Sequence, residues 1–113
     1  HQIIVANAGH PPPLLLCDDA GEFVTTSIGV PVGVSARPAY TPVTLTVPAR
    51  ATLLAFTDGL VERRGESLDA GFSRLHDVAV GARGSLEEFM TLLIAQLASS
   101  SDDTALLGVR WQK

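Results

Sequence analysis

The spacing of apolar residues changes about halfway along the chain. In the first half, short runs rich in Val, Thr, Ile and Leu are separated by Pro and Gly, a pattern typical of short strands joined by tight turns. We predict strands at 2–7, 12–17, 22–26, 41–47 and 51–57. Residues 29–34, Gly-Val-Pro-Val-Gly-Val, are too rich in turn formers for a regular element, and we expect an ordered loop there.

In the second half, apolar residues recur every three or four positions, which indicates helices. This spacing predicts a helix over 68–80, ended by glycines. Ser85 and Glu88 form a capping box at the start of a second helix, predicted over 86–98. Residues 104–110 are typical of a final buried strand. This order of elements predicts an α+β fold with a largely antiparallel sheet and helices on one face.

Composition limits the classes of protein that the chain can represent. It has 113 residues, of which 46% are hydrophobic, so we expect one globular unit or a piece of one. Its net charge of −4, with scattered basic residues, argues against nucleic-acid binding and against an anionic membrane. Cys17 is the only cysteine, which excludes an intrachain disulfide and makes a cytoplasmic location the default. The chain begins in an apolar run at His1, and we expect the natural start to lie upstream.

Acidic residues stand at the ends of two predicted strands. Asp58 follows the strand 51–57, and Gly59 lets the backbone turn sharply beside it. Asp102 and Asp103 precede the last strand. If these strands pair antiparallel, Asp58 and Asp102 meet at one edge of the sheet, where Mg²⁺ or Mn²⁺ would relieve their repulsion. Asp-Gly is also a common turn, and an acidic pair can simply end a linker, so spacing alone leaves a structural role open.

Four short motifs follow one another along the chain. They are Asn-Ala-Gly-His-Pro-Pro-Pro at 7–13, Gly-Val-Pro-Val-Gly at 29–33, Phe-Thr-Asp-Gly-Leu-Val-Glu-Arg at 56–63 and Asp-Asp-Thr-Ala-Leu-Leu at 102–107. In this order they resemble the stage II sporulation E branch of the protein phosphatase 2C superfamily, which includes phosphatases that regulate stress sigma factors. The chain departs from the family at 48–50, Pro-Ala-Arg, where Pro-Gly-Asp or similar is usual.

The resemblance implies a β-sandwich flanked by helices, with residues 1–113 as the C-terminal portion of a single phosphatase domain. It implies two Mn²⁺ or Mg²⁺ ions, with Asp58 and Asp102 completing the second. The aspartate that bridges both ions belongs to an Asp-x-Gly-His-Gly motif, which this chain lacks. Asp103 is then close to the metal or caps the strand. Asn7 and His10 would lie near the site, although forming a turn is the favoured reading for both.

The implied activity is hydrolysis of phosphoserine or phosphothreonine by water activated between two metal ions. The implied substrate is a phosphorylated anti-sigma factor antagonist, on family analogy alone. We expect activity from the complete domain, and at best weak metal binding from this chain. Exposed apolar sheet edges would associate with the missing N-terminal half or with another copy.

Two alternatives remain open. One is a catalytically inactive binding or regulatory module of the same fold. The other is a generic α+β domain with turn aspartates, whose parent protein would show no saturable divalent-cation binding. Glu62, Arg63 and Arg64 directly follow the Asp58 turn. We favour a solvated surface run for them over a role in steering a phosphorylated substrate.

Overall fold

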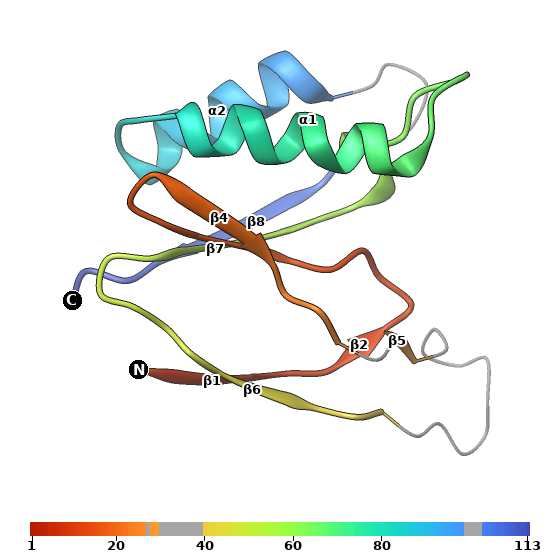
Figure 1. Cartoon of the computed structure of the whole chain (residues 1–113). Helices are drawn as coiled ribbons and strands as arrows, with labels where there is room; N and C mark the ends of the chain where they lie inside the picture. Colours follow the sequence, from red (N-terminus) through yellow and green to blue (C-terminus); the bar gives the residue numbers. More distant parts are fainter. Residues whose placement is uncertain (27, 30–39, 99–102) are drawn as a thin grey trace.

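Two α-helices cover one face of a four-stranded antiparallel sheet in the computed structural model of the chain (Figure 1). The structure describes residues 1–26, 28–29, 40–98 and 103–113. The strands are β1 (Gln2–Val5), β2 (Asn7–Ala8), β3 (Leu14–Cys17), β4 (Ala20–Phe23), β5 (Ile28–Gly29), β6 (Val43–Thr46), β7 (Thr52–Phe56) and β8 (Leu106–Arg110). The helices are the short 3₁₀ helix η1 (Asp58–Leu60), α1 (Leu68–Gly81) and α2 (Leu86–Leu97).

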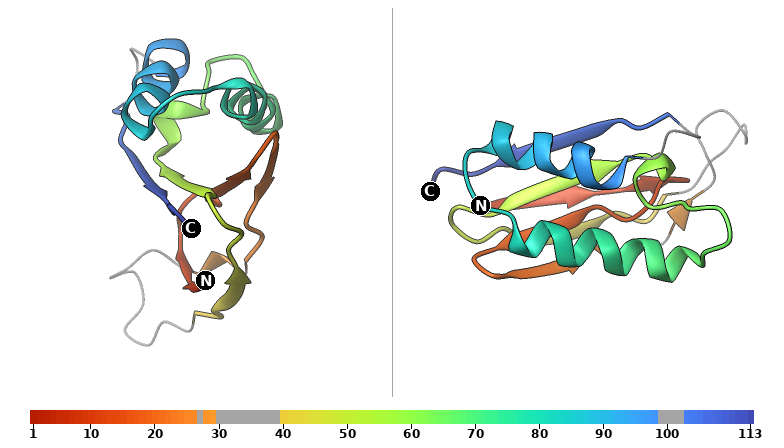
Figure 2. Two further views of the ribbon diagram at one scale, coloured as in Figure 1. Left: turned by 90° about the vertical axis from the view of Figure 1, so that its left-hand side faces the viewer. Right: turned by 90° about the horizontal axis from the view of Figure 1, so that it is seen from above.

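The four-stranded sheet has the order β4-β3-β7-β8, and every neighbouring pair in it is antiparallel. The last strand therefore returns to pair with β7, with Phe56 opposite Leu106 and Thr52 opposite Arg110. β1 and β6 form a separate antiparallel pair on the side of this sheet away from the helices (Figure 2). The predicted α+β fold with antiparallel pairing and helices on one face is confirmed.

Several strands differ from the sequence-based prediction. The strand predicted at 2–7 is divided into β1 and β2, which pair with different strands, and the last strand begins at Leu106 instead of residue 104. β4 begins at Ala20, two residues earlier than expected, because Asp18 adopts a left-handed φ of 53° and closes a two-residue turn after β3. Aspartate tolerates this conformation better than most residues. Ile28–Gly29 pairs in parallel with Asn7–Ala8, so the expected loop begins with a short strand. Residues 30–34 of that loop lie outside the described residues.

The core lies between the sheet and the helices. Alternate residues of β3 and β7 point toward α1 and α2. The apolar faces of these two helices pack against them. The fully buried residues of this layer include Leu14, Leu54, Leu75, Phe89 and Leu93. Ser67 caps α1 by accepting from the Ala70 amide. Ser85 and Glu88 form the expected capping box at α2. Both helices thus begin where the sequence predicts.

The other face of the four-stranded sheet, on the side of β1 and β6, is apolar and only partly buried. Leu15, Leu53 and Val109 lie opposite one another across three strands, and Ala55 lies opposite Leu107. The side chains of Leu107 and Val109 are 65% and 43% exposed. In addition, β8 is an edge strand. Within the part of the chain that the structure describes, neither helix is long and apolar enough to span a bilayer.

Helix α1 packs directly on the backbone that follows η1. A Cβ atom on Gly71 would lie only 1.9 Å from the Val61 carbonyl oxygen, a distance that real Cβ atoms do not adopt. Val61 itself is 1% exposed, so it has little room to move away. Glycine at position 71 therefore lets α1 approach the segment that carries Asp58.

We predict that Gly71→Ala destabilises the protein by about 1–3 kcal/mol, because α1 must move away from Val61. Gly81→Ala is the matched control, since no atom lies within 4 Å of a Cβ there and its φ is not left-handed. It should be neutral or stabilising by up to about 1 kcal/mol. Urea unfolding of both variants measures the difference. Equal unfolding free energies would contradict the close approach.

Candidate functional site

Asp58 stands where β7 ends, as the first residue of η1, and its side chain is exposed. Backbone hydrogen bonds and two buried side chains hold the turn that carries Asp58. The Asp58 carbonyl accepts hydrogen bonds from the amides of Val61 at 3.0 Å and Glu62 at 2.8 Å. The next two side chains, Leu60 and Val61, are 0% and 1% exposed and anchor the turn in the core. The carboxylate therefore faces solvent from a well-defined backbone.

The beginning of the β8 segment is bonded to this turn. The Thr57 amide donates to the Ala105 carbonyl at 3.1 Å, and the Ala105 amide donates to the Thr57 hydroxyl at 2.9 Å. The same hydroxyl donates to the Asp103 carbonyl at 3.3 Å. Gly59 completes the contact, because a Cβ there would lie 2.4 Å from the Asp103 carbonyl oxygen. The backbones on either side of Asp58 thus touch residues 103–105.

The antiparallel pairing of β7 with β8 brings the exposed residues Asp58 and Asp103 to the same end of the sheet. Asp102 lies outside the described residues, so its convergence with Asp58 stays a prediction. Gly59 is buried against residues 103 and 104, which gives a physical reason for glycine at that position. Beside it, the buried Thr104 hydroxyl has no hydrogen-bond partner among the residues that the structure describes.

The donor chemistry at this end of the sheet suits a hard divalent cation. Carboxylate and backbone carbonyl oxygens are the ligands that Mg²⁺ and Mn²⁺ prefer. Among residues 1–26, 28–29, 40–98 and 103–113, however, no three His, Cys, Asp or Glu side chains gather into a metal-binding group. A complete cation site at this end of the sheet would need ligands beyond the described residues.

Asn7 and His10 form a turn closed by a side chain. The Asn7 amide nitrogen donates to the His10 carbonyl at 2.9 Å, and the His10 amide donates to the Asn7 side-chain oxygen at 2.8 Å. Asn7 is 5% exposed, and both of these bonds close the turn. His10 is exposed and lines two adjoining cavities of about 260 and 220 Å³, the second of which also includes Thr57. Proximity of this turn to a metal stays a prediction.

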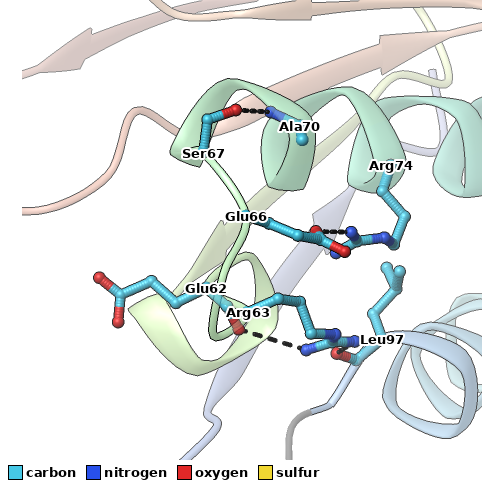
Figure 3. A network of polar contacts seen from close by, with 7 residues as sticks. All are labelled: Glu62, Arg63, Glu66, Ser67, Ala70, Arg74 and Leu97. Carbon is cyan, nitrogen blue, oxygen red and sulfur yellow. Dashed lines mark hydrogen bonds and ion pairs between the residues drawn. The ribbon is translucent and has the colours of Figure 1, made fainter.

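Arg63 has a structural partner that the sequence does not indicate. Figure 3 shows its guanidinium donating to the carbonyl of Leu97, the last residue of α2. Nearby, Glu66 pairs with Arg74 across the start of α1. Arg63 is half-buried, so the prediction of a solvated run is wrong for it, whereas Glu62 and Arg64 are exposed. Arg63 thereby ties the Asp58 turn to the helix end that precedes residues 99–102.

A larger cavity of about 640 Å³ lies at the opposite end of the sheet, where β7 begins and β8 ends. Of the three arginines that line it, Arg83 and Arg110 bond to other parts of the protein, and Arg50 has no such bond among the described residues. Arg110 donates to the Thr52 hydroxyl and to the Gly84 carbonyl, both at 2.8 Å. Arg83 pairs with Asp19. These contacts link turns between elements, and they give no indication of a ligand.

Comparison with known proteins places the chain in a family. The family model described as stage II sporulation protein E (SpoIIE) matches residues 1–112. No curated protein matches. The crystal structure of the RsbU and RsbW domains of Rv1364c from Mycobacterium tuberculosis is 30% identical with a TM-score of 0.80, over 97% of this chain and 33% of that chain.

Two structures from Bacillus subtilis share the fold. One holds the PP2C phosphatase domain and a fragment of the regulatory domain of the cell fate determinant SpoIIE. It is 19% identical with a TM-score of 0.74, over 96% of this chain and 34% of that chain. The other is the phosphatase domain of SpoIIE, 18% identical with a TM-score of 0.63, over 99% of this chain and 52% of that chain.

This chain thus spans between about a third and about half of the solved chains that it resembles. The antiparallel sheets and two helices correspond to part of a PP2C-like phosphatase domain. Because the family model matches residues 1–112 of the 113, the chain belongs to the stage II sporulation protein E (SpoIIE) family of PP2C-like phosphatases.

Proposed function

We propose that residues 1–113 are the C-terminal portion of a metal-dependent serine/threonine protein phosphatase domain, in which Asp58 and Asp102 bind Mn²⁺ or Mg²⁺. The observation that carries this proposal is the bonded contact between the Asp58 turn and residues 103–105. Asp102 is adjacent in sequence to that contact. The residue that follows Asp102, Asp103, is therefore held against the turn that carries Asp58.

The reaction is hydrolysis of a phosphoserine or phosphothreonine ester. Water adds to phosphorus, the bond to the side-chain oxygen breaks, and inorganic phosphate and a free hydroxyl result. Two bound divalent ions supply activation of water and neutralisation of phosphoryl charge. Asp58 presents its carboxylate from a fixed turn, and no protein nucleophile is needed. Cys17 is the only thiol in the chain, and this proposal gives it no role as a nucleophile. It is the last residue of β3, opposite Ala20 in the hairpin with β4.

The substrate in this proposal is a phosphorylated regulatory protein of the anti-sigma factor antagonist type, and the reaction is cytoplasmic. Support comes from the motif resemblance to phosphatases that regulate stress sigma factors, and from similarity to the structure of RsbU and RsbW domains. The exposed position of Asp58 at the end of β7 suits a phosphorylated side chain on a protein surface.

We further propose that the preceding part of the same domain covers the apolar sheet face formed by Leu15, Leu53, Ala55, Leu107 and Val109. This chain corresponds to 52% of the solved SpoIIE phosphatase domain, so the relative has about as much again to contribute. Burial of these side chains would contribute about 25 cal/mol for each Å² removed from water. In isolation, the same face should drive self-association.

We predict that Asp58→Asn lowers Mn²⁺-dependent phosphoprotein hydrolysis by the complete domain at least about 100-fold. Loss of an outer partner of a metal ligand already costs about 10- to 100-fold, and loss of a ligand itself should cost more. Asp18→Asn is the control, because Asp18 lies in the turn between β3 and β4 and asparagine accepts its left-handed φ of 53°. Full activity of Asp58→Asn would refute the assignment of Asp58.

We predict that Leu107→Ser has one effect on the isolated chain and a different effect on the complete domain. In the isolated chain it should reduce self-association measured by analytical ultracentrifugation, since it removes the side chain that is 65% exposed on the apolar sheet face. In the complete domain it should lower the unfolding free energy by about 2–4 kcal/mol, because the leucine is buried there.

Ile94→Ser is the control for that pair of measurements. Ile94 is 50% exposed on helix α2, which lies on the other side of the sheet. It should change neither association nor stability by a comparable amount. A complete domain that tolerates Leu107→Ser as well as Ile94→Ser would show that the sheet face stays partly exposed.

A further inference from the structure

Thr57 makes more bonds between the Asp58 turn and the β8 segment than any other described residue. Its amide donates to the Ala105 carbonyl. Its hydroxyl accepts from the Ala105 amide at 2.9 Å and donates to the Asp103 carbonyl at 3.3 Å. A hydroxyl has one proton to donate and lone pairs to accept with, so both roles can be filled at once. Valine, which has the shape of threonine but no hydroxyl, could form neither of these two side-chain bonds.

The two hydroxyl bonds hold the stretch of backbone that leads into β8. Regular pairing of β7 and β8 ends at Phe56 and Leu106. Beyond that pair, the Thr57 amide bonds the Ala105 carbonyl, and the Thr57 hydroxyl adds bonds to residues 103 and 105. Gly59 allows the approach by placing no side chain against the Asp103 carbonyl. The residue adjacent to Asp58 thus sets where the backbone next to Asp102 runs.

We propose that Thr57 is a positioning residue whose hydroxyl holds the backbone of residues 103–105 against the Asp58 turn and so fixes how far Asp103 lies from Asp58. The inference rests on the proposed metal-dependent function. Without the hydroxyl, the Ala105 amide and the Asp103 carbonyl each lose a partner, and of the Thr57 bonds only the one from its amide to the Ala105 carbonyl still holds residues 103–105 to the turn. Metal affinity falls as a result, while the fold, which depends on the core beneath, persists.

The test compares Thr57→Val with Thr57→Ser in the complete domain. Valine keeps the shape of threonine and removes the hydroxyl, whereas serine keeps the hydroxyl. Amide exchange of Ala105 is followed by NMR without metal, and Mn²⁺ affinity is measured by calorimetry. Thr57→Val should speed Ala105 exchange and weaken Mn²⁺ binding about tenfold. Thr57→Ser should keep both close to the wild-type values.

Thr44→Val is the matched control, because Thr44 is exposed on β6, outside the four-stranded sheet. It should leave both measurements unchanged. Wild-type Mn²⁺ affinity in Thr57→Val, or a Thr57→Ser variant as weak as Thr57→Val, overturns the role of Thr57 alone. Absence of saturable Mn²⁺ binding by the wild-type domain overturns the proposed function itself, and the role of Thr57 with it.

Discussion

The antiparallel pairing of β7 with β8 is the constraint on which the site depends. These strands are separated in sequence by η1 and both α-helices, and the chain returns to the sheet only after α2. Their register places Phe56 opposite Leu106, so the residues that follow β7 and those that precede β8 meet at one end of the sheet. The core of α1 and α2 on the sheet holds this pairing in place. Asp58 and Asp103 lie at that end of the sheet.

Two glycines turn this strand pairing into a defined local structure. Gly59 lets the turn lie against the Asp103 carbonyl, and Gly71 lets α1 lie against the Val61 carbonyl. The segment between them is therefore confined by β8 on one side and by a helix on the other. Arg63 adds a third tie, to the last carbonyl of α2. Such a segment can present a carboxylate with little loss of conformational entropy when a cation binds.

The sequence predicts those features whose signal is local. The capping box of Ser85 and Glu88 marks the start of α2 within four residues, and the position of Asp58 follows from the end of an apolar strand. The parallel pair of β2 and β5 was not predicted, because two-residue strands carry no periodicity. The bonds of Thr57 and Arg63 run to residues between 34 and 48 positions away, so no spacing pattern indicates them.

The central claim is that a divalent cation binds between the Asp58 turn and the acidic pair before β8. Anomalous diffraction at the manganese absorption edge, from crystals of the complete domain grown with Mn²⁺, tests it most directly. The account predicts a manganese peak within about 2.0–2.2 Å of an Asp58 carboxylate oxygen, with Asp102 as a second ligand. A manganese peak remote from both residues, or ordered Asp58 and Asp102 side chains on opposite sides of the sheet, would contradict it.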